Sequence, residues 1–146
     1  MKKILIPVDS SEFSERAVEA GKKFAKAFDC EVLLLHVVGL RVTSLRFSTS
    51  VPAAEPFDSF DTHERGYAED MLETYKNSFG DMKDKVETKV LFGIVADEII
   101  RTINNSDVDF VIVGSHGIGS ALFRAFLGSV ANKVVHHSLK PVLVVK

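Results

Sequence analysis

The sequence predicts an α/β protein built on one doubly wound parallel sheet with helices on both faces. The first observation is a set of short, continuous runs of Val, Ile and Leu, which are typical of strands buried on both faces of a parallel sheet. The second is that segments with helical spacing separate these runs, in the alternation that parallel strands and their crossovers require. The 146 residues fit a single domain spanning residues 1–146.

Five segments are expected to form strands. Four of them are continuous apolar runs, as strands in the middle of a parallel sheet should be. The segment 86–92 instead alternates polar and apolar residues, which indicates an edge or half-exposed strand. The five expected strands are residues 4–8, 32–38, 86–92, 110–113 and 142–145.

Four helices are expected between these strands, because apolar residues recur three or four positions apart. In the first helix the acidic residues Glu12 and Glu15 precede Lys22, Lys23 and Lys26, which suits the helix dipole. Gly80 is expected to end the second helix as a C-terminal cap. The apolar stripes are Phe13, Ala17, Ala20, Phe24 and Phe28; Tyr67, Met71, Tyr75 and Phe79; Ala96, Ile99, Ile100 and Ile103; and Leu127, Val130 or Ala131, and Val134.

Residues 39–61 are the one long irregular connection. They hold Pro52 and Pro56 and a Ser/Thr-rich run, and connections of this length in compact domains usually act as lids or contact surfaces. Their seven apolar residues, Val, Leu and Phe, are too many for a solvated linker. We therefore expect a flap at about 39–61 that is ordered by itself or by a partner.

Composition excludes several classes of protein. The formal net charge of −2 argues against binding nucleic acid through its phosphate backbone, which needs a surplus of Lys and Arg. The single cysteine, Cys30, allows neither an intrachain disulfide nor a cysteine-cluster zinc site, and we expect it to behave as a small apolar residue. The apolar run before Pro7 is three residues long, too short for a signal peptide or a membrane helix. A cytoplasmic protein without a membrane partner is expected.

Three segments should meet at the carboxyl ends of the central strands, where open α/β sheets bind ligands. They are residues 7–11, 36–38 and 114–117, and Gly128-Ser129 stands before the last helix. Glycine permits positive φ and lets the backbone approach a phosphate, and Ser129 can cap the helix or donate to an anion there. The alternative is that the glycines only form a tight turn and that Ser129 only caps.

The remaining histidines and the nearest cation are weaker candidates. His36 ends a buried strand and is expected to be structural, while His116 is expected to meet a ligand through its backbone rather than as a catalyst. His136-His137 is not expected to bind a metal, because neighbouring helical residues point about 100° apart. Arg124 is read as a solvated surface residue.

The combined pattern resembles the ATP-binding branch of the universal stress protein family. The resemblance rests on Ile4-Leu5-Ile6-Pro7-Val8-Asp9-Ser10-Ser11, Leu34-Leu35-His36-Val37, Val111-Ile112-Val113-Gly114-Ser115-His116-Gly117, Leu127-Gly128-Ser129-Val130-Ala131 and Lys140-Pro141-Val142-Leu143-Val144-Val145. The family motif is G-x2-G-x9-G-[ST]. Here ten residues separate Gly117 from Gly128, one more than in the motif, and we expect the extra residue to bulge within residues 118–126, where Phe123 or Phe126 could cover the cleft.

The resemblance implies a Rossmann-like five-stranded sheet in the order 3-2-1-4-5 and a homodimer joined through the last strand. It implies that Asp9 and the backbone of Val37 hold adenine, that residues 114–117 line the ribose and phosphates, and that Gly128-Ser129 bind phosphate oxygens. The expected nucleotide-binding residues are Pro7, Asp9, Ser11, Val37, Val113, Gly114, Ser115, His116, Gly117, Gly128, Ser129 and Val130.

The motifs of nucleotide-hydrolysing enzymes are missing from the sequence. It has no G-x4-G-K-[ST] loop, whose lysine neutralises β- and γ-phosphates, and no carboxylate pair is placed for two magnesium ions. We therefore expect a small regulatory protein of the stress-response type that binds ATP, ADP or AMP, with or without Mg²⁺, and hydrolyses ATP slowly if at all. The alternative is a dimeric interaction module with an empty or vestigial cleft. A slow ATPase or nucleotidyl-transferring enzyme would need a catalytic group that we do not find.

Overall fold

The computed structural model describes residues 2–39, 57–118 and 127–146. Strands and helices alternate along the chain, with one short 3₁₀ helix (η1) before β3. The elements are β1 (Lys3–Pro7), α1 (Glu12–Phe28), β2 (Glu31–Gly39), α2 (Phe57–Asn77), η1 (Gly80–Lys85), β3 (Val86–Gly93), α3 (Val95–Asn105), β4 (Phe110–Gly114), α4 (Ser129–His137) and β5 (Val142–Val145). Each expected strand is present, with bounds that differ by at most one residue at either end.

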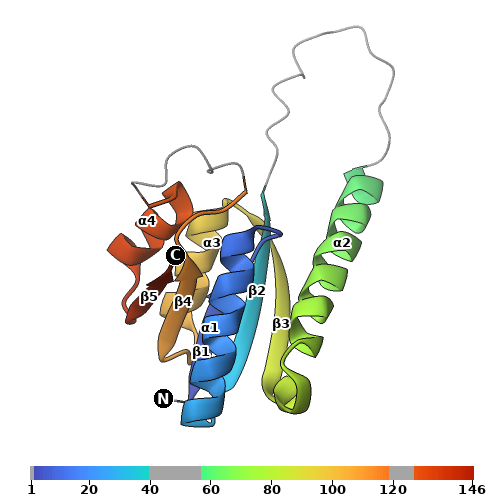
Figure 1. The fold of residues 1–146 in the computed structure, drawn as a ribbon. Coiled ribbons are helices and arrows are strands. Elements are labelled where there is room, and N and C mark those ends of the chain that lie inside the picture. Colours follow the sequence, from blue (N-terminus) through green and yellow to red (C-terminus); the bar gives the residue numbers. More distant parts are fainter. Residues whose placement is uncertain (1, 40–56, 119–126) are drawn as a thin grey trace, which may run out of the picture.

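The five strands form one sheet in the order β3-β2-β1-β4-β5. Every neighbouring pair is parallel, so the predicted order and the predicted strand directions are both confirmed. β1 lies at the centre of the sheet, and β3 and β5 form its edges (Figure 1). The polar alternation of residues 86–92 is thus that of an edge strand, as expected.

Apolar side chains form one buried layer on each face of the sheet. On one face Ile4 and Ile6 of β1 pack with Val18 of α1 and Leu72 of α2. On the other face Leu5 lies in a cluster with residues of α3 and α4, such as Ile103 and Val134. The helices therefore cover both faces, in the doubly wound arrangement that the sequence predicted. Within the described ranges, no helix has the length and apolar character needed to cross a bilayer.

Helix α1 begins and ends with defined caps. Ser11 is its N-cap, and the Ser11 side chain accepts a hydrogen bond from the backbone N–H of Ser14. Asp29 ends the helix in the left-handed conformation, with φ of 50°. The buried face matches the predicted stripe only in part: Ala17 is buried as expected, but Phe28 is 54% exposed, and Val18, Gly21 and Ala25 are buried as well.

Helix α2 starts earlier than the sequence suggested. Residues 57–61, expected in the flap, are its first five residues, and Gly39 belongs to β2. Residues 62–66 are polar or glycine, and residues 62–67 are exposed or partly exposed, so the apolar spacing is interrupted before Tyr67. Tyr67, expected in the buried stripe, is 57% exposed, whereas Ala68 and Leu72 are buried. The rest of the expected flap lies outside the described residues.

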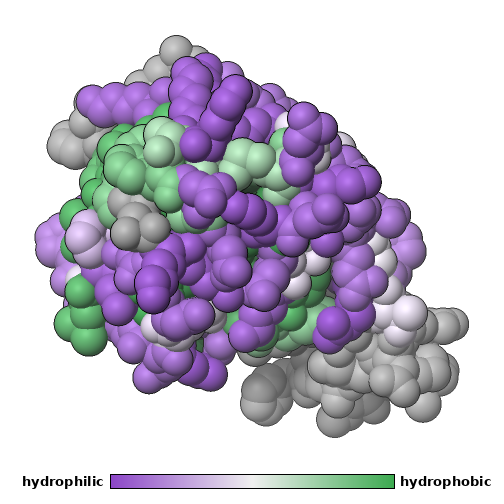
Figure 2. Space-filling model, turned by 90° about the horizontal axis from the view of Figure 1, so that it is seen from below, coloured by the Kyte–Doolittle hydropathy of each residue, from purple (hydrophilic) through white to green (hydrophobic). Residues whose placement is uncertain are grey.

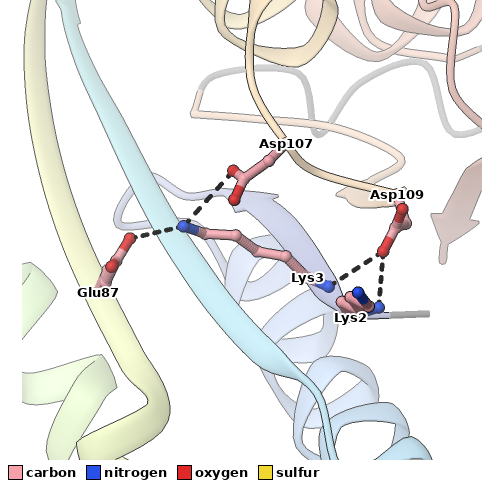
Figure 3. A network of polar contacts seen from close by, with 5 residues as sticks. All are labelled: Lys2, Lys3, Glu87, Asp107 and Asp109. Carbon is pink, nitrogen blue, oxygen red and sulfur yellow. Dashed lines mark hydrogen bonds and ion pairs between the residues drawn. The ribbon is translucent and has the colours of Figure 1, made fainter.

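A polar network closes the end of the sheet where the strands begin (Figure 3). The Lys3 ammonium extends across β2 to Glu87 of β3 at 2.8 Å and to Asp107 at 3.6 Å. The hydrogen bond to Glu87 raises the pKa of Lys3. Asp109 accepts hydrogen bonds from the backbone N–H groups of Lys2 and Lys3, at 2.6 and 3.3 Å. This network ties β1, β3 and the entry to β4 together at the end opposite the ligand edge.

Seen from that end, the surface is mostly hydrophilic (Figure 2). Apolar side chains gather toward the left of Figure 2, which is the side of α4 and β5 in Figure 1. Two of the exposed large apolar residues, Val135 and Leu139, belong to α4 and the turn after it, at 41% and 79% exposure. On the face seen in Figure 2, apolar side chains therefore lie mainly on the side of α4 and β5.

Candidate functional site

A cavity of about 710 Å³ lies at the carboxyl ends of β1, β2 and β4. Its volume falls in the range of small-molecule sites, roughly 300–1,000 Å³. Its position is the switch point of the sheet, where β2 and β4 lie on opposite sides of β1 and where open α/β sheets bind ligands. The structure therefore places the candidate site at the edge that the sequence predicted.

Most of the predicted site residues line this cavity. The lining includes Pro7, Asp9, Val37, Val113, Gly114, His116, Gly117, Gly128, Ser129 and Val130. Ser11 and Ser115 do not belong to the lining. Ser11 instead caps α1, and Ser115 is buried, with its hydroxyl 2.9 Å from Nδ1 of His116. The hydroxyls of Ser11 and Ser115 thus contact residues that line the cavity, and neither serine lines the cavity itself.

Asp9 is held by hydrogen bonds from three segments of the chain. Its Oδ1 accepts from the backbone N–H of Ser11 at 2.9 Å and from the Ser14 hydroxyl at 2.7 Å. Its Oδ2 accepts from the backbone N–H of Ile118 at 3.2 Å. Burial alone would raise the pKa of Asp9, but these hydrogen bonds outweigh it and lower the pKa. Asp9 is thus an ionised acceptor in the wall of the cavity.

Tyr75 of α2 adds a fourth contact to Asp9. Its hydroxyl donates a hydrogen bond to the Asp9 carbonyl at 3.0 Å. Burial, with smaller contributions from Glu15 and Asp9, raises the pKa of Tyr75 to about 12, so the donor stays protonated at physiological pH. The sequence placed Tyr75 on an apolar stripe. Only the phenolic hydroxyl, which seeks a hydrogen-bond partner when a tyrosine is buried, indicated that Tyr75 could contact a polar group of the site.

The site glycines allow close packing, but not through positive φ as we expected. Among the described glycines, only Gly80 and Gly93 have φ in the left-handed region. A Cβ on Gly114 would lie 2.8 Å from the Phe13 carbonyl oxygen, and one on Gly117 would lie 2.8 Å from Oδ2 of Asp9. The requirement for glycine at these two positions is therefore steric, because chain segments meet there without room for a side chain.

The N-terminus of α4 opens into the cavity without a side-chain cap. Gly128 is the N-cap, and its own N–H is bonded to the Ser115 carbonyl at 2.8 Å. The expected capping role of Ser129 is wrong, since Ser129 is the first residue inside the helix. Gly128, Ser129, Val130 and Ala131 all line the cavity. First-turn N–H groups have no intrahelical partner and carry partial positive charge, which suits an anion.

Of the other single residues, His36 and Cys30 have structural contacts, while His116 lies in the cavity wall. The His36 ring donates from Nδ1 to the Val8 carbonyl at 2.8 Å, as expected of a structural histidine. The His116 ring lies 5.0 Å from the Phe13 ring, centroid to centroid. Cys30 is buried in the apolar cluster of α1 and α2, and burial raises the pKa of its thiol. The described residues do not include Phe123, Arg124 and Phe126. Of the segment 118–126, where the extra residue was expected to bulge, only Ile118 is described, and it is 70% exposed.

Sequence reasoning missed the part of the lining that helices contribute. Val95 and Ile99 of α3 and Glu64 of α2 line the cavity, beside the expected Val38 at the end of β2. Ile99 was assigned to the core, which is partly true because it is also buried there, and Val95 was not singled out. Glu64 stands on turns without apolar periodicity, so no pattern in the sequence connected it to the site.

Comparison with known proteins agrees with this geometry. Residues 1–146 match the model of the universal stress protein family. Universal stress protein MJ0577 of Methanocaldococcus jannaschii is 36% identical, over 99% of this chain and 94% of that protein. A solved structure of MJ0577 gives a TM-score of 0.79 at 34% identity, covering 99% of this chain and 95% of the other.

Two more distant solved structures share the fold. One is a universal stress protein family protein from Arabidopsis thaliana with AMP bound, at 23% identity and a TM-score of 0.66, covering 100% of this chain and 92% of that one. The other is the universal stress protein from Archaeoglobus fulgidus in complex with dAMP, at 18% identity and a TM-score of 0.60, covering 100% and 98%.

Proposed function

This chain belongs to the universal stress protein family, and on that premise we propose that its cavity binds an adenine nucleotide and that the protein is a nucleotide-responsive regulator. The observation that carries the proposal is the pairing, in one cavity, of an uncapped helix N-terminus with an ionised acceptor, Asp9. The first suits phosphate oxygens and the second suits a donor on a base or ribose. Two relatives of the same fold hold AMP and dAMP.

The proposed roles follow the shape of the cavity. Asp9 and the backbone at Val37 hold the adenine, because they lie at the ends of β1 and β2. Residues 114–117 line the ribose and phosphates, and Gly128 with Ser129 binds phosphate oxygens at the start of α4. Charge-assisted hydrogen bonds of about 1.5–3 kcal/mol each make micromolar affinity reachable with a few contacts. Any Mg²⁺ that accompanies ATP would be held mainly by phosphate oxygens, as is usual for this ion.

Slow hydrolysis is part of the proposal. A general base must be free to accept a proton from the attacking water. Both carboxylate oxygens of Asp9 already accept hydrogen bonds from the protein, and its lowered pKa makes it a weak base. Asp9 is therefore suited to holding a ligand rather than to activating water.

A thermal-shift titration with ATP and AMP tests the proposal. A ligand present at 100-fold above its Kd stabilises the folded state by about 2.7 kcal/mol, which shifts the Tm of a chain of this size by several degrees. A clear shift with either nucleotide supports binding. Absence of a shift at millimolar nucleotide would favour the alternative, a dimeric interaction module with a vestigial cleft.

We also propose that the protein is a homodimer joined through β5. This strand pairs only with β4 in the described chain and forms one edge of the sheet. Its four residues are Val, Leu, Val and Val, all of them partly exposed, and apolar edge strands tend to be paired or covered. Light scattering at micromolar concentration checks this proposal, and a monomer would contradict it.

A further inference from the structure

We propose that Glu64 selects the base of the bound nucleotide, by accepting a hydrogen bond from the exocyclic amine of adenine. The inference rests on the proposed nucleotide function and adds a specificity determinant to it. Its basis is the position of Glu64 in the cavity wall, the state of its neighbours and the chemistry of purine edges.

Glu64 lies at the end of the cavity away from α4. It belongs to α2, which packs over β2 and β3, and it shares the cavity lining with Val38 and Gly39 at the end of β2. In the sheet order β3-β2-β1-β4-β5, these elements lie across β1 from β4. Figure 1 shows α2 beside β3 on one side of the molecule and α4 beside β5 on the other. The phosphate end and Glu64 are thus separated by the width of the site.

The Glu64 carboxylate is available to a ligand. The side chain is half-buried, and it forms no hydrogen bond or ion pair with any residue in the described ranges. The neighbouring cation is engaged elsewhere: Arg65 pairs with Glu69 at 3.9 Å and lies 4.9 Å from the centroid of the Phe92 ring. A half-buried carboxylate without a counter-ion attracts hydrogen-bond donors and repels acceptors.

The geometry of a nucleotide brings one purine substituent to this place. With the phosphate at the N-terminus of α4, the base lies toward β2, and the edge of a purine farthest from the phosphate carries the 6-substituent. In adenine this substituent is an amine, which donates. In hypoxanthine it is a carbonyl oxygen, which accepts and would face the carboxylate unfavourably, and the donor of this edge moves to the neighbouring N1–H. Glu64 should therefore favour AMP over IMP, two ligands that differ chiefly at this edge.

The experiment compares AMP and IMP affinities by calorimetry in four full-length proteins: the parent, Glu64→Gln, Glu64→Ala and the control Glu73→Gln. Glu73 is an exposed residue of the same helix outside the cavity lining. The parent and the control should bind AMP at least about tenfold more tightly than IMP, the effect of one charge-assisted hydrogen bond. Glu64→Gln should reduce this ratio to within about threefold, because an amide can donate to O6 as well as accept.

Other outcomes separate the two proposals. A parent that binds AMP but retains its AMP/IMP ratio in Glu64→Gln and Glu64→Ala overturns the role of Glu64 and leaves the nucleotide function intact. If the Glu64 variants instead lose discrimination between AMP and dAMP, the carboxylate reads the ribose, which also overturns the inference. If the parent binds none of ATP, AMP and IMP, the proposed function fails, and the inference fails with it.

Discussion

At the scale of single residues, Asp9 joins more parts of the site than any other residue discussed above. Its backbone N–H donates to the Ser14 hydroxyl at 2.8 Å, its carbonyl accepts from Tyr75, and its carboxylate accepts from Ser11, Ser14 and Ile118. Through these contacts the end of β1 is fixed to α1, to α2 and to the glycine loop. A ligand that meets Asp9 therefore meets an acceptor whose orientation is set before binding.

Asp9→Asn should make stability less dependent on pH. The folded-state pKa of Asp9 is lowered, so its ionised form stabilises the fold above the unfolded pKa of about 3.9, and this stabilisation is lost as pH falls through the folded pKa. We expect the variant to be about 1–3 kcal/mol less stable than the parent at pH 7, and this difference to shrink below pH 4. Urea unfolding at pH 7 and pH 3 measures it.

The control for that comparison is Asp70→Asn. Asp70 is exposed on α2, where its backbone carbonyl accepts a hydrogen bond from the Thr74 hydroxyl, and its carboxylate forms no hydrogen bond or ion pair in the described part of the chain. Its substitution should leave both the stability at pH 7 and the pH dependence close to those of the parent. An Asp9→Asn variant whose deficit stays constant from pH 7 to pH 3 would contradict the role assigned to the ionised carboxylate.

Gly117→Val should abolish nucleotide binding while the chain remains folded. A Cβ at this position meets Oδ2 of Asp9 at 2.8 Å, so the carboxylate or the loop must move, and the added methyl groups enter the cavity that Gly117 lines. Calorimetry with ATP and AMP measures binding, and circular dichroism verifies the fold. Binding as tight as that of the parent would show that the phosphates lie elsewhere.

At the scale of elements, α2 carries a glycine that nothing nearby requires. Gly66 lies inside the helix, and a Cβ built there has no heavy atom within 4 Å. Gly66→Ala should therefore raise the free energy of unfolding by about 0.5–1 kcal/mol, because alanine loses less backbone entropy in a helix. Chemical denaturation measures the gain. A loss of stability would mean that the helix is not continuous at this point.

The strands were predictable to within a residue, and so were the buried faces of α3 and α4, whereas the buried faces of α1 and α2 were predictable only in part. In a strand that is buried on both faces, every residue is apolar, so a continuous run of Val, Ile and Leu marks both the strand and its buried residues. In α1 the face against the sheet is made of small residues: a Cβ on Gly21 would lie 2.2 Å from Cδ1 of Ile6. Phe28, the last residue of the predicted stripe, is 54% exposed.

The site was predictable where it follows strand ends and not where it depends on tertiary packing. Asp9 and Gly114 come directly after apolar runs and Gly117 lies three residues later, so the topology of a parallel sheet brings them together. Tyr75 and Glu64 reach the same place from a helix that follows residues 40–56. Their spacing in the sequence carries no information about that approach, because it depends on how α2 packs across β2 and β3.

At the scale of the whole molecule, the proposed dimer can be tested without disturbing the sheet. The carbonyls of Pro141 and Val145 accept from Val111 and Ser115 beside β4. In a parallel strand the alternate residues direct both N–H and C=O to the other side, so those of Val142 and Val144 face the open edge.

Val144→Pro should therefore give a folded monomer, because proline removes an outward N–H and is tolerated on an edge strand. Light scattering measures the mass, and circular dichroism measures the fold. Leu143→Pro is the matched control: its N–H faces β4, so this substitution should destabilise the sheet itself. A Val144→Pro variant that remains a dimer would show that β5 is not the interface.

The central place of β1 has a consequence for synthesis on the ribosome. One edge of this strand pairs with β2, but its other edge must wait for β4, and the Lys2 and Lys3 N–H groups must wait for Asp109. At translation rates of about 5–20 residues per second, the wait is on the order of 5–20 seconds. During that interval the nascent chain carries an apolar strand with one unpaired edge, the form in which polypeptides aggregate most readily. Chaperone dependence should therefore be greatest before β4 emerges.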